Sequence, residues 1–173
     1  MADKNDSIEN LPHTKGIEKM KQLAEDSDIC MFVTALDQLP LDSRPMSTQK
    51  VDEQGNIWFL SDKNSNKNKH IAADNRVQLF YANKNSSEYL SIYGEAEILY
   101  DRELIKEMWT SNIAKAWFEE GADDPDISLI KVDPKDVYYW DTKHNRFVAL
   151  LKIGVSIITG KTMDDGVEGK LKV

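Results

Sequence analysis

The strand-like segments of this sequence are joined by connections that are too short for crossover helices. Runs of β-branched, aromatic and aliphatic residues, which favour strands, recur along the chain between groups of turn-forming residues. Parallel neighbours need a connection of about a dozen residues or more, so most of these runs should pair antiparallel. We expect six or seven short strands, drawn from residues 29–36, 44–51, 57–61, 77–82, 89–100, 127–132, 137–140 and 146–153.

The segments between these runs predict how the strands pair. Residues 44–51 and 57–61 flank a turn in which Gly55 can take a positive φ, so they are expected to form a hairpin. Gly94 lies inside the longest run and indicates a β-bulge. Helices are expected at residues 14–27, at residues 66–73 and from residue 101 to about residue 112. The sequence thus predicts a mainly β fold, a small antiparallel β-barrel with peripheral helices.

Length and charge limit the class of protein. A chain of 173 residues suits one domain with a substantial core, expected over residues 14–173 after a flexible arm at residues 1–13. The net charge of −8 argues against nucleic acid or an anionic membrane as partner. The polar, acidic start and the lack of a long apolar stretch predict a cytoplasmic protein. Cys30 lies in an apolar run and is interpreted as an inert buried thiol, and the sequence shows no metal-binding motif.

The densest group of candidate binding residues lies at residues 61–70, where a strand should lead into a helix. Residues 62–76 hold four bases and two acids, so this segment is locally positive in an acidic chain. The start of a helix presents unpaired N–H groups that attract anions, and Ser61, Ser65 and Lys67 add hydroxyl donors and a cation. These features predict a phosphate pocket. The alternative is an ordinary solvated turn, and His70 on the expected helix is either a surface residue, which is favoured, or a ligand contact.

Large aromatic residues gather in the second half of the chain. They are Trp109, Trp117, Phe118, Tyr138, Tyr139 and Trp140. Such residues form either part of the core or a flat wall for a planar ring or a second subunit. Trp117 and Phe118 directly precede an acidic loop at residues 119–126, which favours partial exposure and therefore the second interpretation.

Four motifs in a fixed order resemble the pyridoxamine 5′-phosphate oxidase-related split barrels that bind FMN. They are RPM at residues 44–46, WFLS at residues 58–61, SxK at residues 65–67 and NRV at residues 75–77. Later segments, AWFEEG at residues 116–121, DPD at residues 124–126 and YWD at residues 139–141, resemble the general stress protein branch of that superfamily. The resemblance spans roughly residues 17–160.

This resemblance implies a Greek-key split barrel and a homodimer with FMN in clefts at the subunit interface. By position, the residues that would hold the FMN phosphate are Ser61, Ser65 and Lys67. Those that would line the edge of the isoalloxazine ring are Arg44, Met46 and Ser47, with Gln49 near the ring or the ribityl chain. The residues that would close the site, from the same or the other subunit, are Trp117, Phe118 and Trp140.

The sequence also departs from the oxidase itself. Asn66 and Tyr89 stand where the oxidase carries an arginine and a glutamine, and its arginine-rich C-terminal segment is not recognisable in residues 157–173. The resemblance therefore implies an FMN-binding flavoprotein with an oxidoreductase activity on an unidentified substrate and NAD(P)H as a candidate electron donor. A non-catalytic flavin-binding or flavin-sensing module is the alternative, and oxidation of pyridoxine or pyridoxamine phosphate is the least favoured. Whether the chain is an enzyme stays open at this stage.

Overall fold

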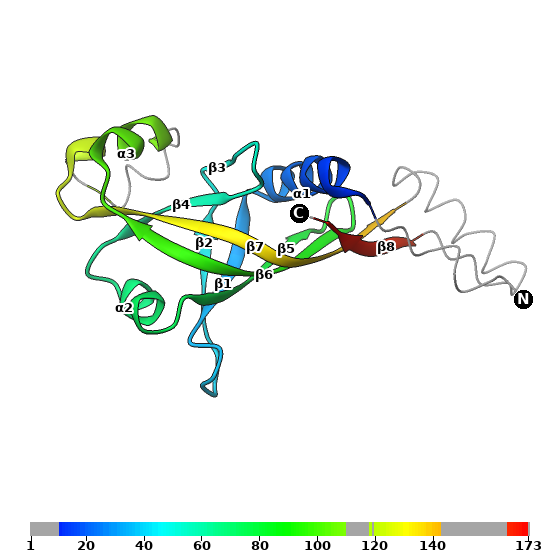
Figure 1. Cartoon of the computed structure of the whole chain (residues 1–173), viewed down its shortest axis with the longest axis horizontal. Helices are drawn as coiled ribbons and strands as arrows, with labels where there is room; N and C mark the ends of the chain where they lie inside the picture. The colour runs from blue at the N-terminus through cyan, green and yellow to red at the C-terminus, as the bar shows by residue number, and fades with distance from the viewer. Residues whose placement is uncertain (1–10, 110–117, 119, 143–165, 173) are drawn as a thin grey trace, which may run out of the picture.

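The computed structural model describes residues 11–109, 118, 120–142 and 166–172. In these residues eight strands form one antiparallel sheet in the order β2-β1-β5-β6-β7-β4-β3, with β8 paired to β7 (Figure 1). The strands are β1 (Ile29–Thr34), β2 (Asp42–Ser47), β3 (Lys50–Val51), β4 (Ile57–Asp62), β5 (Arg76–Asn83), β6 (Glu88–Leu99), β7 (Ile127–Thr142) and β8 (Gly166–Leu171). The helices are α1 (His13–Ser27), α2 (Asn66–Ala73) and α3 (Arg102–Met108), with a short 3₁₀ turn, η2 (Gly121–Asp123).

The sheet curls into a half-barrel, which confirms the expected mainly β split-barrel fold. The two ends of the sheet approach each other, because β2 at one end also contacts β4 next to the other end. The connection between β2 and β3 joins the two ends of the sheet through backbone hydrogen bonds. The backbone N–H of Thr48 donates to Asp28 O at 2.8 Å on the β1 side, and that of Gln49 donates to Trp58 O at 2.8 Å on the β4 side.

This closure also corrects the expected hairpin. Residues 44–51 do not form one strand against residues 57–61, because β2 pairs along its whole length with β1. Only the two residues of β3 pair with β4 around the turn. A short turn predicts a local hairpin, but the chain leaves one edge at Ser47 and joins the other at Lys50, so the two halves of the run belong to opposite edges.

One long strand replaces the two that were expected at residues 127–132 and 137–140. β7 runs through Asp133 and Pro134, which lie opposite Glu95 and Gly94 where the register shifts. The predicted bulge at Gly94 is therefore confirmed. A Cβ atom at Gly94 would lie 2.6 Å from Asp133 O, so glycine allows this close approach. The strand expected at residues 146–153 lies outside the described residues, and β8 was not expected.

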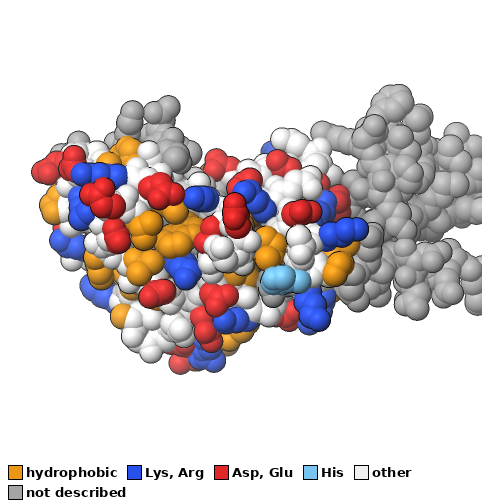
Figure 2. Space-filling view, turned by 45° about the horizontal axis from the view of Figure 1, so that its top comes forward, with side chains coloured by type: hydrophobic (Ala, Val, Ile, Leu, Met, Phe, Trp, Pro, Cys, Tyr) orange, Lys and Arg blue, Asp and Glu red, His pale blue; other side chains and the backbone are white. Residues whose placement is uncertain are grey.

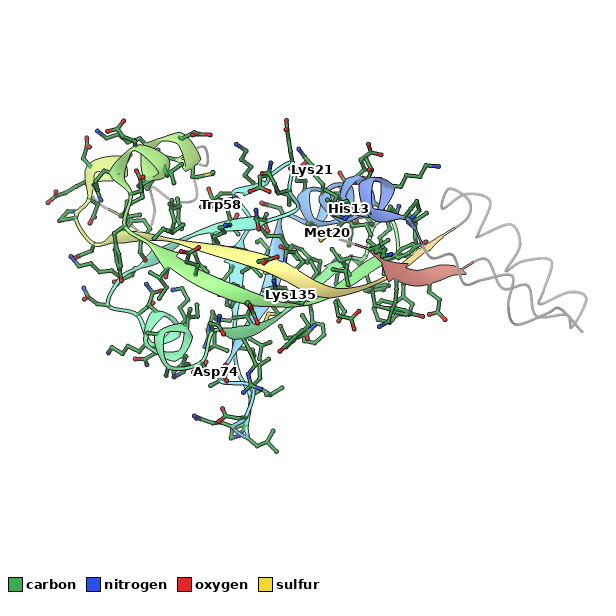
Figure 3. All side chains as sticks on the ribbon, viewed as in Figure 1. His13, Met20, Lys21, Trp58, Asp74 and Lys135 are labelled. Atoms are coloured by element: carbon green, nitrogen blue, oxygen red, sulfur yellow. The ribbon has the colours of Figure 1, made fainter. Side chains whose placement is uncertain are left out.

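Two groups of apolar side chains hold the fold together. The larger group lies inside the curl, where Met20 and Leu23 of α1 pack against Phe32, Leu79 and Ile92 of the sheet. The smaller group lies beneath α3 and joins Trp58, Ile105, Met108, Phe118, Ile127 and Leu129. Figure 3 shows Met20 on α1 and Trp58 near the α3 end of the molecule. On the face seen in Figure 2, acidic and basic side chains are interspersed, with hydrophobic side chains gathered in patches between them.

Candidate functional site

The strand-to-helix turn before α2 is built around the buried side chain of Asn68. Ser65 is the N-cap of α2, and its Oγ accepts from the Asn68 backbone N–H at 3.4 Å. The Asn68 amide then joins three elements: its Oδ1 accepts from Ser61 Oγ at 2.7 Å, and its Nδ2 donates to Ser128 Oγ at 2.8 Å. Ser128 Oγ in turn donates to Ser61 O at 3.1 Å. The network fixes the start of α2 against β4 and β7.

This network changes the role of the predicted serines. Ser61 is almost fully buried, and its hydroxyl hydrogen is directed to Asn68 within the protein. Ser65 is half-buried and also lies 3.3 Å from Asn68 Oδ1. The free donors at this end of α2 are backbone groups, because among the described residues the N–H groups of Asn66 and Lys67 have no acceptor.

Two cations lie together beside this turn. The half-buried Lys67 on α2 and Arg44 on β2 are close enough that the guanidinium contributes to lowering the pKa of the Lys67 ammonium. Burial is the larger cause of this shift, and Asp62 opposes it. Within the described part of the chain, Lys67 has no ion pair or hydrogen bond. A half-buried, unpaired ammonium next to a guanidinium makes this point of the surface attractive to an anion.

The other basic residues of the segment 62–76 either form ion pairs with nearby acids or are exposed to solvent. Lys63 pairs with Asp126 at 2.8 Å, at the end of the acidic loop. Arg76 pairs with Asp74 at 2.6 Å and lowers the pKa of that carboxyl to about 2. Lys69 is exposed on α2. The locally positive segment therefore presents one half-buried cation, Lys67, rather than four equivalent ones.

Sequence reasoning missed the residues that hold Arg44 in place. Thr34, fully buried at the end of β1, accepts from Arg44 Nη1 at 2.8 Å, and Asp42 pairs with the same guanidinium. His70 approaches the same group, with its Nδ1 3.0 Å from Thr34 Oγ1 and 3.5 Å from Asp42 Oδ2. His70 is half-buried in this cluster rather than fully exposed, and it also lines a surface pocket. No local motif could have revealed this cluster, because Thr34 lies on β1, Asp42 lies on β2 and His70 lies in the last turn of α2.

The end of β2 supplies the remaining predicted residues. Met46 packs against the larger core, and Ser47 Oγ donates to Asp28 Oδ1 at 3.2 Å. Gln49 donates from Nε2 to Ser47 O at 3.1 Å, while its Oε1 is buried and has no hydrogen-bond partner. A buried acceptor without a donor is unusual, because desolvation of the carbonyl is then not compensated. Arg44, Met46 and Gln49 thus follow one another along one segment that starts at the cation pair.

The aromatic residues do not gather at this site within one chain. Phe118 is buried beneath α3, 6.1 Å from Trp109 between ring centroids, so the expectation that it is partly exposed was wrong. Trp140 is 41% exposed and lies about 40 Å along β7 from Ser128 at 3.3 Å per residue, so it is far from the start of α2 in the same chain. Trp117 lies outside the described residues.

The outer side of the sheet carries exposed apolar residues. Met31 lies opposite Phe80, Phe80 lies opposite Ser91, and Tyr89, two residues from Ser91, lies opposite Trp140. Strand alternation puts these side chains on the same side as Ile29. We call Ile29, Met31, Phe80, Tyr89 and Trp140 the outer apolar face; each is between 41% and 48% exposed.

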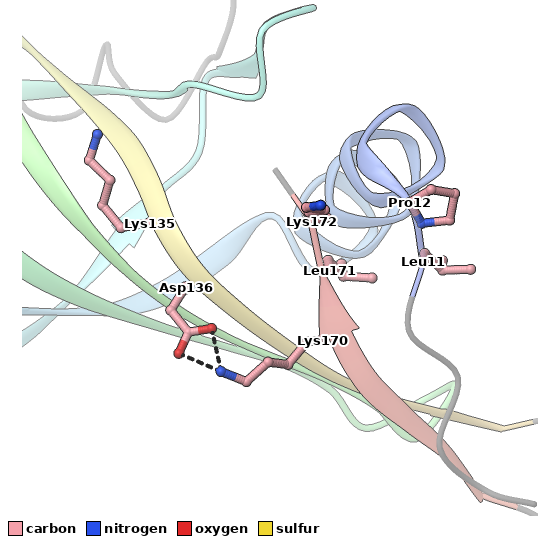
Figure 4. A pocket seen from close by; sticks show the side chains of 7 residues that line it. All are labelled: Leu11, Pro12, Lys135, Asp136, Lys170, Leu171 and Lys172. Atoms are coloured by element: carbon pink, nitrogen blue, oxygen red, sulfur yellow. Dashed lines mark hydrogen bonds and ion pairs between the residues drawn. The ribbon is translucent and has the colours of Figure 1, made fainter.

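Two pockets open on the described surface. One, of about 410 Å³, is lined by Ala35, Gln38, Pro40, Leu41, Asp42, Ser43 and His70, and so adjoins the Arg44 cluster. The other, of about 540 Å³, lies where β8 ends beside the start of α1 (Figure 4). Two of its three lysines are paired: Lys170 bonds Asp136 at 3.0 Å, and Lys135 pairs with Asp133, while Lys172 is exposed. It contains none of the predicted site residues.

Three further observations limit the chemistry. Burial raises the pKa of the Cys30 thiol to about 12, although a hydrogen bond to Tyr81 opposes the shift, so the buried thiol is a poor nucleophile. In the described ranges, no three His, Cys, Asp or Glu side chains are placed to hold a metal ion. The described helices include none with the length and apolar character needed to span a membrane.

Comparison with known proteins identifies the family. The model of the family described as pyridoxamine 5′-phosphate oxidase like matches residues 15–164, most of the chain. The chain belongs to this family. The crystal structure described as a general stress protein 26 from Jannaschia sp. CCS1 is 27% identical, with a TM-score of 0.76 over 90% of this chain and 97% of that chain.

Two further relatives extend this likeness. The general stress FMN/FAD-binding protein from Xanthomonas citri has a TM-score of 0.61 at 24% identity, over 73% of this chain and 87% of that chain. Protein bli-3 from Neurospora crassa is 24% identical over 128 residues, which are 69% of this chain and 61% of that relative. The chain therefore spans about three-fifths of the length of this curated relative. Within this pyridoxamine 5′-phosphate oxidase-like chain, Arg44, Gln49 and Lys67 all lie inside the matched range, whereas β8 lies beyond it.

Proposed function

We propose that this protein binds FMN, with the phosphate held between Arg44 and Lys67 at the start of α2. The observation that carries the proposal is the half-buried Lys67 ammonium, which lies beside a second cation and has no ion pair in the described chain. Burial of a cation without a partner is unfavourable, so a dianion that supplies the missing charge is stabilised there. The free backbone N–H groups of Asn66 and Lys67 add donors, and Ser65 positions them as N-cap.

The donor set also fits the rest of the cofactor. Met46 lies on the same side of β2 as Arg44 and offers an apolar edge for the isoalloxazine ring, whereas Ser47 lies on the other side and its hydroxyl donates to Asp28. The buried Gln49 Oε1 lacks a donor, and the ring N–H or a ribityl hydroxyl of FMN would supply one. Ser61 supports the site indirectly in this proposal, because its hydroxyl holds Asn68 rather than facing the surface.

We propose further that the outer apolar face joins two copies of the chain, with the flavin near the interface. Five exposed apolar side chains on four strands form a continuous face of the kind that marks an association surface. Trp140 lies far from the start of α2 in its own chain, and a second copy would bring its Trp140 to the partner. Phe118 is better explained as core, and the role of Trp117 as a wall stays a prediction.

The bound flavin would supply hydride and electron transfer, which supports an oxidoreductase on an unidentified substrate with NAD(P)H as donor. The chain itself would bind and orient the cofactor and exclude water from its ring. Titration of the apoprotein with FMN should quench flavin fluorescence with a Kd of about 1 μM, which corresponds to about 8 kcal/mol. No quenching up to about 100 μM would refute the proposal. Anaerobic NADH or NADPH then separates the two functions: bleaching of the flavin band supports an oxidoreductase, and persistent colour supports a flavin-binding module.

A further inference from the structure

We infer that ligand binding at the Arg44–Lys67 pair is coupled to protonation of His70, which sets the charge of the site. This inference rests on the proposed function and concerns how the phosphate site is regulated. It starts from the place of the imidazole beside the cation pair. His70 follows Lys67 by three residues on α2, so the two side chains leave the same face of the helix. An imidazole is the side chain that ordinarily changes its charge between pH 5 and pH 8.

Asp42 links His70 to the cation that the ligand needs. One carboxylate oxygen of Asp42, Oδ1, pairs with Arg44 Nη2, and the other, Oδ2, lies 3.5 Å from His70 Nδ1. The side chain of Asp42 is 45% exposed, so it has room to turn from one partner to the other. In the empty site Asp42 therefore occupies the guanidinium that the phosphate would bind, and His70 is the alternative partner next to it.

The charges nearest His70 balance one another while the imidazole is neutral. From β2 the imidazole faces Asp42 and Arg44, and from its own helix it faces Lys67, whose ammonium is also influenced by Asp62 at the end of β4. The neighbour on β1, Thr34, is uncharged. Two acids thus offset two bases around the proposed phosphate site. The protonation state of His70 decides whether this group carries a net positive charge.

The charged groups farther out do not oppose protonation of His70. Asp74, one turn later on α2, pairs with Arg76 of β5 at 2.6 Å. The same guanidinium interacts with Asp37 of the β1–β2 loop, so this outer group carries one more acid than base. Lys69 lies on the exposed side of α2, where solvent screens its charge.

The hydrogen bonds give the neutral and the charged imidazole different partners. Because Thr34 Oγ1 accepts from Arg44 Nη1 at 2.8 Å, its own hydrogen is directed to His70 Nδ1 at 3.0 Å. The neutral ring then carries its hydrogen on Nε2. A proton taken up from solvent makes Nδ1 a donor, and Asp42 Oδ2 is the carboxylate oxygen that it faces. Asp42 then pairs with the imidazolium and leaves Arg44 to the phosphate.

The sign of the coupling follows from this exchange. Protonation of His70 makes the group net positive, which favours a dianion, and a bound phosphate in turn makes His70 easier to protonate. Affinity for FMN should therefore rise as the pH falls from 8.0 to 6.5. The phosphate of the ligand works in the opposite direction, because it begins to lose its second charge as the pH approaches about 6.

Titrations with FMN between pH 8.0 and pH 6.5 test the coupling. The Kd of the wild type should fall at least about threefold over this range. His70→Asn keeps a polar group near the place of Nδ1 but cannot take up a proton, so its Kd should stay level or rise slightly as the pH falls. His13→Asn is the matched control, because His13 lies at the start of α1, apart from α2 (Figure 1), and should keep the wild-type pH dependence.

Calorimetry measures the proton itself. Binding of FMN at pH 7.5, compared in two buffers of different ionisation enthalpy, should show net proton uptake in the wild type and none in His70→Asn. The phosphate of FMN cannot mimic this result, since a phosphate placed between cations releases protons rather than binding them. Binding without proton uptake in the wild type would contradict the exchange of Asp42 between Arg44 and His70.

Asp42→Asn separates the coupling from a structural role of the cluster. Loss of the carboxylate frees Arg44 at every pH, so FMN should bind more tightly than in the wild type at pH 8.0 and with a weaker pH dependence. A merely structural Asp42 would weaken binding instead. A wild-type Kd that does not change with pH, or weaker binding by Asp42→Asn at pH 8.0, would overturn this inference alone. If FMN binds at no pH, the proposed function fails and the inference fails with it.

Discussion

Asn68 on α2 donates a hydrogen bond from Nδ2 to Ser128 Oγ on β7 at 2.8 Å, although 60 residues separate them in the chain. Through Oδ1 the same amide accepts from Ser61 on β4. All three side chains are buried, so no water is at hand to replace a lost partner. The start of α2, on which the proposed phosphate site depends, is therefore held by one amide side chain.

Replacement of Asn68 by alanine should destabilise the fold and loosen the site together. The change removes the acceptor of the Ser61 hydroxyl and the donor to Ser128 Oγ, and each hydrogen bond lost between buried groups costs about 1–3 kcal/mol. We expect the free energy of unfolding in urea to fall by about 2–3 kcal/mol and the Kd for FMN to rise at least tenfold. Asn66→Ala is the matched control, since Asn66 is exposed on the same helix and should change neither value appreciably. An Asn68→Ala protein with wild-type stability would contradict the network.

Lys67→Met should make the apoprotein more stable and a poorer flavin binder. Burial lowers the pKa of the Lys67 ammonium, which means that the folded state disfavours its charged form. An uncharged side chain of similar length removes this penalty, and we expect only a small gain in the free energy of unfolding, because solvent still reaches part of the ammonium. The Kd for FMN should rise at least tenfold, because half of the cation pair is lost.

The control for this change is Lys69→Met, which removes the same charge from the exposed side of α2. It should leave both stability and FMN affinity close to the wild-type values. Equal loss of affinity in the two variants would show a diffuse electrostatic effect rather than a site at Lys67. Unchanged affinity in Lys67→Met alone would remove Lys67 from the phosphate site.

Phe80→Glu should convert the proposed dimer to a monomer. Phe80 is 46% exposed in the single chain, so the change should alter monomer stability by no more than about 0.5 kcal/mol. Light scattering should give twice 19.8 kDa for the wild type and 19.8 kDa for the variant. FMN affinity should fall as well, because the proposed site takes Trp140 from the second copy. Tyr100→Glu, at a more exposed aromatic beyond the end of β6, should stay dimeric. A monomeric wild type would refute the outer apolar face as an interface.

Local signals predicted the parts of this fold that are local. The helix at residues 66–73 is confirmed to the residue, and Ser65 caps its start. The antiparallel pairing is also confirmed, because the lengths of the connections can be read from the sequence and most are too short to join parallel strands. The pairing of residues 44–51 was wrong because closure of the barrel depends on Thr48 and Gln49, which bond strands on opposite edges.

The candidate site was only partly predictable for a related reason. Arg44 and Lys67 could each be named from their motifs, but their closeness is a property of the folded sheet. Thr34 and His70, which hold the site together, belong to no local pattern. The predicted exposure of Phe118 was wrong because the composition of a segment does not reveal whether another element covers it. In the folded chain, α3 covers Phe118.

The buried Cys30 and Tyr81 should make the protein lose stability above pH 9. Burial raises the pKa of Cys30 from 9.0 to about 12 and that of Tyr81 well above 10.0. Below pH 9 the thiol is protonated in both the folded and the unfolded chain, so it adds no pH dependence. Between pH 9 and 12 the unfolded chain releases this proton while the folded chain keeps it, and unfolding is favoured as the pH rises. The slope per group approaches about 1.4 kcal/mol per pH unit.

Cys30→Ala isolates the thiol in this pH dependence. The variant should lose about 1–2 kcal/mol at every pH, because a buried sulfur is removed, but its stability should fall less steeply than that of the wild type from pH 9 to pH 10. The decline that remains comes from Tyr81, which is half ionised at pH 10 in the unfolded chain and stays protonated in the folded one. Urea denaturation at pH 8, 9 and 10 measures this difference in slope, which the constant loss does not affect. Parallel curves for wild type and variant across that range would show that the Cys30 thiol has an ordinary pKa in the folded protein.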